Sequence, residues 1–134
     1  MCAQDPVTAS SSRQIPDRAH AVGPGWLPLL GRLHERVITA WPGYQLVDLK
    51  EKFGGLRIRL EFPEGSESST LRALVEAAEE EAAVTCEFCG ALGRARTRGD
   101  VPGGWLKTVC DNCHLAWTAH QLMIINGAVR YRSV

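Results

Sequence analysis

The chain has 134 residues, of which 45% are hydrophobic and 22% charged, and its 15 basic and 15 acidic side chains give a formal net charge of zero. This composition is typical of one globular domain and excludes collagen, a coiled coil and wholesale disorder. No apolar run approaches the ~18 residues that a membrane span needs, and the balanced total gives no global field that would attract nucleic acid.

Residues 1–24 are rich in Ser, Pro, Gly and polar side chains, and we expect them to form a flexible N-terminal arm. They lack the apolar core of about 7–15 residues that a secretory signal carries, so we expect a cytoplasmic protein. Thiols stay reduced in that compartment. Cys2 has no activating neighbour and is interpreted as a spare thiol.

A single small α+β domain is expected over residues 25–134. Its first helix should begin near Gly25-Trp26, and Trp41-Pro42-Gly43 should end it. Apolar side chains recur through this segment at spacings of three and four, which predicts one buried face. That face comprises Trp26, Leu29, Leu30, Leu33 and Val37.

Residues 44–62 alternate between apolar and polar on both sides of Gly54-Gly55, which predicts a β-hairpin with a two-residue glycine turn. In this register Lys52 faces Arg57 and Lys50 faces Arg59. The other side should be the core side, with Glu51 as its odd member. Its apolar residues are Val47, Leu49, Phe53, Leu56, Ile58, Leu60 and Phe62.

The four opposed cations Lys50, Lys52, Arg57 and Arg59 would destabilise the hairpin by a fraction of a kcal/mol per pair. An acidic helix over about Ser69–Ala83 follows, and residues 61–83 hold one basic and seven acidic side chains. Three explanations stay open. The Glu76–Glu81 cluster docks across the basic face, an outside phosphate or acidic protein binds there, or salt screens the charges.

Two C-x-x-C pairs, separated by 20 residues, form the clearest chemical signal in the chain. Four thiolates at this kind of spacing are typical of a closed tetrahedral zinc site, with Zn–S bonds of about 2.3 Å. Gly90 follows the first pair and suits the left-handed backbone that closes such a loop. We therefore predict one structural zinc ion per chain, held by Cys86, Cys89, Cys110 and Cys113.

The cysteines also admit other interpretations. The sequence from Cys110 to His114 matches a c-type haem attachment motif, but that would require export and leave the first pair unexplained. A redox dithiol would need a thioredoxin-like context, which the chain lacks. Iron fits four thiolates as zinc does and stays open. His114 could replace Cys113 as a ligand, or donate to a sulfur from outside the ligand set.

The order of elements around the cysteines predicts a treble-clef-like module over residues 85–123. A knuckle at the first pair should lead into a hairpin, Gly93–Arg98 returning through Trp105–Val109. A helix should open at Asp111, whose charge suits a helix start. Beyond it, Asn126-Gly127 either caps a longer helix or turns a hairpin, and both stay open.

A second basic group lies on this zinc hairpin, with Trp105 beside it. Such a group is typical of a phosphate-contacting surface with a stacking residue, and the alternative is a solvated hairpin with Trp105 packed on the metal site. Its cations are Arg94, Arg96, Arg98 and Lys107.

Two resemblances add to these predictions. The segment W-L-K-T-V-C-D-N-C-H resembles the closing half of His-Asn-His nucleases, which implies a catalytic histidine on the hairpin, but residues 90–109 contain none. More of the chain resembles a group of small, uncharacterised bacterial and phage proteins, which implies the zinc site and the fold order but no activity. That resemblance is carried by G-W-L-P-L-L, K-E-K-F-G-G-L-R, T-C-E-F-C-G and W-L-K-T-V-C-D-N-C-H, at residues 25–30, 50–57, 85–90 and 105–114.

From the sequence we therefore expect an α+β zinc protein with no complete catalytic constellation. The leading function is non-enzymatic interaction with a protein partner through one of the basic hairpins. The second is nucleic-acid binding through the same cations, and the third is a nuclease-related enzyme. No membrane partner is expected, and the oligomeric state stays open.

Overall fold

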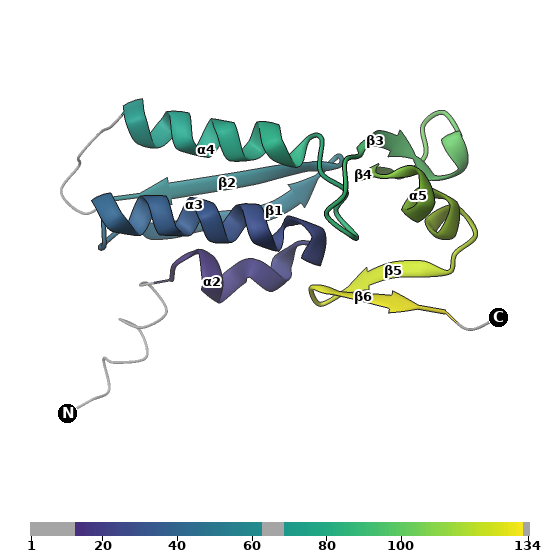
Figure 1. Ribbon diagram of the computed structural model, residues 1–134, viewed down its shortest axis with the longest axis horizontal. Coiled ribbons are helices and arrows are strands. Elements are labelled where there is room, and N and C mark those ends of the chain that lie inside the picture. The colour runs from purple at the N-terminus through teal and green to yellow at the C-terminus, as the bar shows by residue number, and fades with distance from the viewer. Residues whose placement is uncertain (1–12, 63–68, 133–134) are drawn as a thin grey trace.

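The computed structural model describes residues 13–62 and 69–132. Over these residues the chain is α+β, with helices and three separate two-stranded antiparallel hairpins. The fold has two parts that lie end to end along its long axis (Figure 1). Each part has its own cluster of buried hydrophobic side chains, one under the long helices and one around the cysteines. Within the described residues, no helix is long and apolar enough to cross a membrane.

The chain enters the fold through a short helix, α2 (Ile15–Arg18), followed by the 3-10 turns η2 (Ala19–Ala21) and η3 (Pro24–Trp26). Ile15 and Val22 are buried in the first cluster. The expected flexible arm over residues 1–24 is therefore wrong for residues 13–24, and residues 1–12 lie outside the described part. The polar composition of this stretch does not indicate that Ile15 and Val22 are buried.

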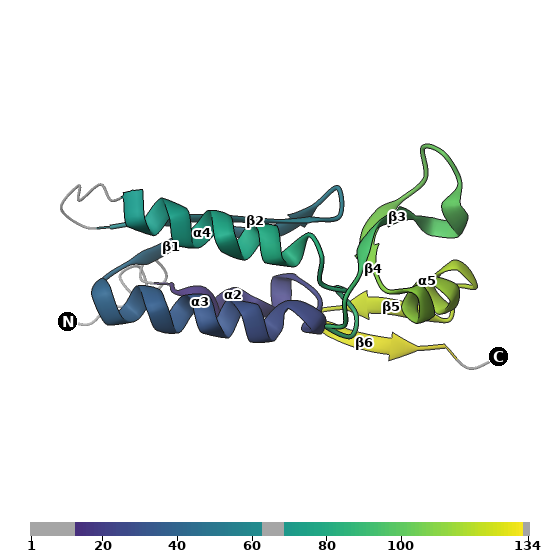
Figure 2. The ribbon, with the colours of Figure 1, turned by 45° about the horizontal axis from the view of Figure 1, so that its top comes forward.

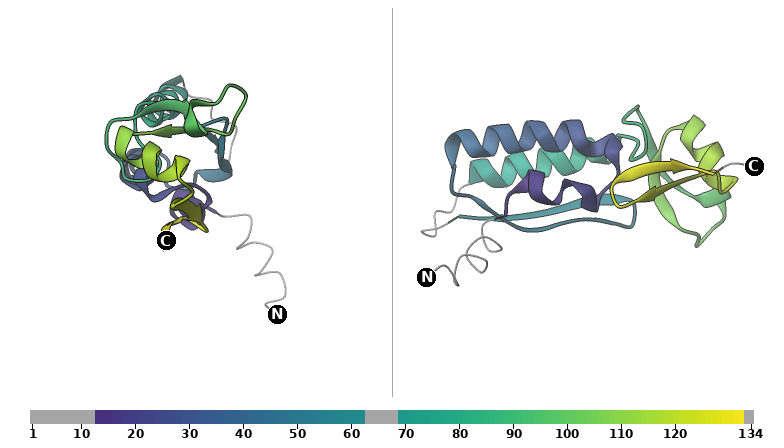
Figure 3. Two further views of the ribbon diagram at one scale, coloured as in Figure 1. Left: turned by 90° about the vertical axis from the view of Figure 1, so that its right-hand side faces the viewer. Right: turned by 90° about the horizontal axis from the view of Figure 1, so that it is seen from below.

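The helix α3 (Leu27–Ala40) follows directly, and Trp41 ends it, as the sequence predicts. Its predicted apolar face is buried throughout, and Trp26 is fully enclosed at the helix start. Figures 2 and 3 show α3 and α4 (Ser69–Ala82) side by side over the β1–β2 hairpin. The expected second helix, Ser69–Ala83, is thereby confirmed.

The hairpin consists of β1 (Gln45–Lys52) and β2 (Gly55–Glu61), but its register differs from the predicted one. Lys50 pairs with Arg57 and Lys52 with Gly55, so the turn residues are Phe53 and Gly54 instead of the two glycines. Both turn residues have positive φ, 54° and 80°. From the turn to Asp48 the pairing shifts by two positions, which preserves the faces because side chains alternate with period two, and a bulge between Leu46 and Asp48 changes the register beyond it.

Two residues that the sequence placed on the core side of the hairpin are instead exposed. Phe53 sits in the turn and is 71% exposed, and Val47 lies at a bulge in β1 and is 45% exposed. The like-charge ladder is also shorter than predicted, because Arg59 faces Asp48 and only Lys50 and Arg57 oppose each other.

The second half of the chain follows the predicted order. The strands β3 (Arg94–Thr97) and β4 (Leu106–Val109) form the expected hairpin, and α5 (Asp111–Thr118) opens directly after Cys110. The alternative left open at Asn126-Gly127 is resolved as a hairpin, between β5 (Leu122–Ile125) and β6 (Ala128–Tyr131).

Candidate metal centre

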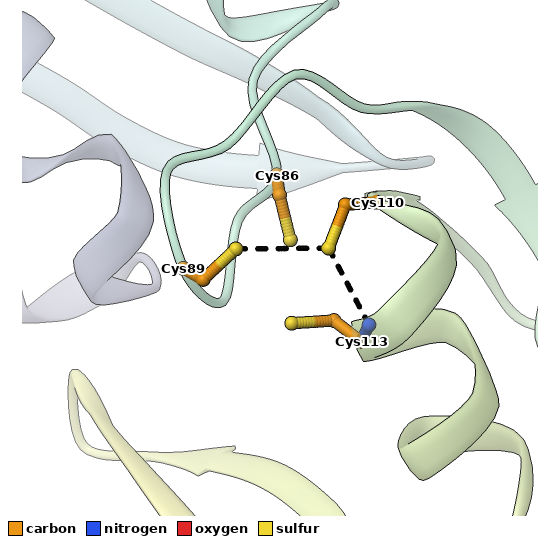
Figure 4. Close-up of side chains that lie close together, drawn as sticks. All are labelled: Cys86, Cys89, Cys110 and Cys113. Carbon is orange, nitrogen blue, oxygen red and sulfur yellow. Dashed lines mark hydrogen bonds between the residues drawn. The ribbon is translucent and has the colours of Figure 1, made fainter.

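The four cysteines of the two C-x-x-C pairs converge on one point. Their Sγ atoms all lie within 4.8 Å of one another, and among the described residues they are the group that can hold a metal ion. Figure 4 shows two of them on the loop before β3 and two at the start of α5, with all four side chains directed inward. The sequence-predicted ligand set, Cys86, Cys89, Cys110 and Cys113, is thus brought together.

The spacing of the sulfurs fits a tetrahedral ion. Cys89 Sγ lies 3.6 Å from Cys110 Sγ, close to the ~3.8 Å edge of a tetrahedron with 2.3 Å metal–sulfur bonds. A disulfide would require about 2.05 Å, and all four thiols are free. The donor chemistry therefore matches a closed four-thiolate site.

A tight backbone turn presents the first pair. The N–H of Gly90 donates to Cys86 O at 2.9 Å, and the N–H of Cys86 donates to Ala91 O at 2.7 Å. The N–H of Ala91 also points at Cys89 Sγ, 3.5 Å away. Gly90 closes the turn at φ 86°, the left-handed conformation that the sequence indicated.

The start of α5 presents the second pair. Cys110 caps the helix, with its Sγ accepting the N–H of Cys113 at 3.4 Å. A helix N-terminus favours negative charge, so this position favours a thiolate. Burial raises the pKa of Cys86 and of Cys113. Burial acts the same way at Cys110, but the N–H of Cys113 and the neighbouring thiols outweigh it and lower that pKa.

His114 lies outside the cluster. Its side chain is buried, and its Nε2 lies 3.0 Å from Thr97 O and 3.6 Å from Asp100 Oδ1. The ring therefore ties α5 to the β3–β4 hairpin, and this contact does not involve a cysteine. This ring nitrogen therefore neither replaces Cys113 as a metal ligand nor donates to a cysteine sulfur.

Glu87, inside the first knuckle, is a residue that sequence reasoning missed. Its carboxylate is 2% exposed, accepts the N–H of Gly23 at 3.0 Å and pairs with Lys107 Nζ at 2.9 Å. Its backbone N–H donates to Thr108 O, and its carbonyl accepts the N–H of Gly25, both at 2.9 Å. Glu87 thus fastens the knuckle to both η3 and β4, and only tertiary contacts reveal this role.

The two predicted basic groups have different surroundings. On the β3–β4 hairpin, Arg96 pairs with Asp100 and Asp111. Arg98 donates to Trp117 O and stacks on the Trp117 ring. With Lys107 bound to Glu87, three of the four predicted cations on this hairpin have internal partners, whereas Arg94 is exposed.

The cations of the β1–β2 hairpin stay at the surface. Lys50, Lys52, Arg57 and Arg59 are all exposed, and Lys50 lies 3.3 Å from Asp48. We expected, as one of three explanations, that the Glu76–Glu81 cluster of α4 docks across these cations, and it does not. Glu79 accepts the N–H of Ile58, and Glu81 pairs with Arg32 of α3.

Trp105 is 72% exposed, so the alternative in which it packs on the metal site is wrong. It lines a hollow of about 300 Å³ together with the tip of the β1–β2 hairpin. Trp117, in contrast, is buried in the second cluster.

Comparisons with protein-family models, with curated proteins and with solved structures find no match. The two resemblances described from the sequence stay predictions.

Proposed function

We propose that the four cysteines hold one structural zinc ion in a treble-clef-like module, and that the stabilised chain is a non-enzymatic protein-interaction module. The observation that carries the zinc assignment is the convergence of four thiols within 4.8 Å of one another, with the Cys89 and Cys110 sulfurs 3.6 Å apart, near the ~3.8 Å edge of a zinc–thiolate tetrahedron. Reduced thiols are needed for this site, so we expect the protein to work in the cytoplasm.

The closed ligand set supports a structural role for the metal. A catalytic zinc keeps a coordination position open for water, whereas four thiolates complete the tetrahedron. The second hydrophobic cluster holds five buried residues, and Cys86 is one of them. A core this small needs a further source of stability, which a structural metal supplies.

Exposed apolar side chains on the metal half support an interaction role. Trp105, directly before β4, is 72% exposed, and Leu115, in α5, is 68% exposed. Large exposed apolar side chains add nothing to the fold and are typical anchors at protein interfaces.

Nucleic-acid binding is the second candidate, favoured by one observation. The exposed cations of the β1–β2 hairpin form a solvent-facing group that a phosphate backbone would complement. The internal pairing of Arg96, Arg98 and Lys107 weighs against extending that surface onto the zinc hairpin.

Metal analysis of the reduced, purified chain tests the zinc assignment. We expect one zinc per chain, and a lower melting temperature after chelation. Cys113→Ser should abolish stoichiometric binding, since it removes one of four thiolates. The matched control Cys2→Ser should leave both metal content and melting temperature unchanged.

Two results would overturn the assignment. A metal-free chain whose melting temperature ignores chelator would require a redox explanation of the cysteines. One iron per chain in place of zinc would keep the site and change its metal. Gel-shift measurements at low and high salt address the second candidate, because phosphate contacts predict affinity that falls steeply with salt.

A further inference from the structure

The tip of the β1–β2 hairpin and the β3–β4 hairpin enclose a hollow of about 300 Å³. Its lining residues are Glu51, Phe53, Gly104, Trp105 and Leu106. The two aromatic rings on its rim are 71% and 72% exposed. They come from segments about fifty residues apart in the chain, so the fold, and not local sequence, brings them to one site.

Phe53 is an unusual residue for its place. Its φ of 54° and the φ of 80° at Gly54 are those of a turn that favours Asn, Asp or Gly at both positions. A bulky residue in this left-handed region is strained. The exposed ring recovers little of that cost by packing. Strain and exposure at one residue indicate a role in binding.

The hollow is preformed by contacts beneath it. The Oγ1 of Thr108 donates to Gly54 O at 2.7 Å, which fixes the turn on β4. The N–H of Gly54 donates to Glu51 Oε2, also at 2.7 Å, and Lys107 Nζ lies 3.9 Å from Glu51 Oε1. A ligand therefore meets two held hairpins, which lowers the entropy lost on binding.

The charges beside the hollow favour an acidic ligand. Lys52 Nζ lies 5.6 Å from the centroid of the Phe53 ring. Lys50 and Arg57 come next on that face of the hairpin, directly opposite each other, and all three are exposed. Asp48, whose carboxylate lies 3.3 Å from Lys50 Nζ, offsets part of their mutual repulsion, and carboxylates of a bound segment would offset the rest.

The hollow itself suits an apolar side chain better than a phosphate. Glu51 contributes a carboxylate to its wall, which would repel a phosphate, while Phe53, Trp105 and Leu106 supply apolar surface. A side chain placed between two aromatic rings is the usual form of an interface anchor.

We propose that this hollow docks an acidic segment of a partner protein through one large apolar anchor. The anchor lies between Phe53 and Trp105, and the flanking carboxylates contact Lys52, Lys50 and Arg57. This inference rests on the proposed function, because the β3–β4 wall of the hollow belongs to the zinc module.

Selection from a random linear peptide library displayed on phage tests the proposal with the zinc-loaded chain. We expect enriched peptides to carry one aromatic or large aliphatic residue within a run of Asp and Glu. Their binding should weaken about tenfold or more in Trp105→Ala and in Phe53→Asn. The asparagine variant relieves the turn, so it should melt at the same or a higher temperature and lose affinity without unfolding.

Tyr131→Ala is the matched control, because this aromatic residue at the end of β6 is 80% exposed but does not line the hollow. It should bind the selected peptides as the wild type does. Failure to enrich any peptide class, or peptides that bind both aromatic variants like wild type, would overturn the proposal. So would salt-sensitive binding of a single-stranded oligonucleotide that depends on Trp105 while no peptide is selected.

Metal content and melting temperature, recorded on the same samples, separate the two levels of failure. A chain that lacks zinc removes the proposed function. A zinc-loaded, cooperatively melting chain that selects no acidic peptide removes only the docking surface.

Discussion

Gly25 shows how closely the first half of the chain approaches the metal knuckle. A Cβ at this position would lie 2.1 Å from Cys86 O and 2.6 Å from Gly90 N, and both atoms belong to the backbone of the knuckle. Backbone atoms cannot move aside as a flexible side chain does. The absence of a side chain at Gly25 is therefore what permits this contact.

Gly25→Ala should lower the free energy of unfolding by about 2 kcal/mol, since the extra methyl group forces apart packed backbone. Gly31→Ala is the matched control, because Gly31 lies in α3 and a Cβ there meets nothing within 4 Å. That change should raise stability by up to ~1 kcal/mol, as alanine is the better helix former. Urea denaturation of both variants checks the opposite signs. Equal effects would show that Gly25 does not hold the knuckle.

At the residue scale, the sequence predicts the metal ligands because their chemistry is local. Each C-x-x-C pair can reach one ion from a single turn, and the spacing alone identifies the four candidate ligands. Glu87 carries no such signal. Its partners, Gly23 and Lys107, are 64 and 20 residues away, and no periodicity connects them. His114 illustrates the converse error, because adjacency to Cys113 suggested a metal role while its ring turns toward Thr97.

At the scale of elements, the sequence predicts the helices α3, α4 and α5, but neither α2 nor the turn of the β1–β2 hairpin. The apolar face of α3 repeats every three to four residues, which leaves no alternative. In the β1–β2 hairpin, both Gly54-Gly55 and Phe53-Gly54 can form a two-residue turn. Contact of Gly54 with β4 is what selects the second: its carbonyl accepts from Thr108. Because β4 lies far along the chain from Gly54, the local sequence of the β1–β2 hairpin does not determine its register.

The segment over α2 and η2 shows the same limit. Its composition resembles a flexible arm, but Ile15 and Val22 are 1% and 2% exposed. The N–H of Ile15 donates to Tyr44 Oη at 2.9 Å, and the same oxygen lies 2.7 Å from His34 Nδ1. Burial raises the pKa of Tyr44. Two aliphatic side chains and one hydroxyl thus turn a polar stretch into part of the core.

Removal of residues 1–24 should therefore destabilise the chain. Each buried aliphatic side chain contributes about 2 kcal/mol, and the carboxylate of Glu87 loses the N–H of Gly23. We expect a lower urea midpoint and weaker metal retention under chelator. A chain that starts at Arg13 is the control, since it keeps every contact described here. Identical midpoints for the two truncations would contradict the role assigned to this segment.

At the scale of the whole molecule, the two hydrophobic clusters meet through polar and glycine contacts. The turn of the β5–β6 hairpin rests on η2, where a Cβ at Gly127 would lie 2.6 Å from the Cα of His20. The metal half is thus held by the knuckle at one place and by this turn at another. We therefore expect loss of the metal to lower the stability of the whole molecule.

The pH dependence of stability should change sign with the metal. Without it, burial raises the pKa of Cys86 and Cys113, so the folded chain keeps protons that the unfolded chain releases. Stability is then complete below the unfolded thiol pKa of about 8.5 and falls as pH rises beyond it. The lowered pKa of Cys110 opposes this at one site. With metal bound, thiolates are required, and stability falls as pH decreases.

Melting temperatures of the loaded and the chelated chain, measured from mildly acidic to mildly alkaline pH, check this prediction. Cys113→Ser should follow the chelated profile in the acidic range, whereas Cys2→Ser should follow the loaded one. Profiles that run parallel with and without metal would show that the thiolates do not couple binding to folding.

The contact of Gly23 and Gly25 with the knuckle also orders events during synthesis. The segment that seats the first cysteine pair leaves the ribosome about sixty residues before that pair, and the second pair follows some twenty residues later. A nascent chain can therefore position its first two thiols against finished structure before their partners exist. If the cluster binds zinc as proposed, metal capture cannot precede synthesis of Cys113, and a truncated product that ends before Cys110 holds only half of the ligand set.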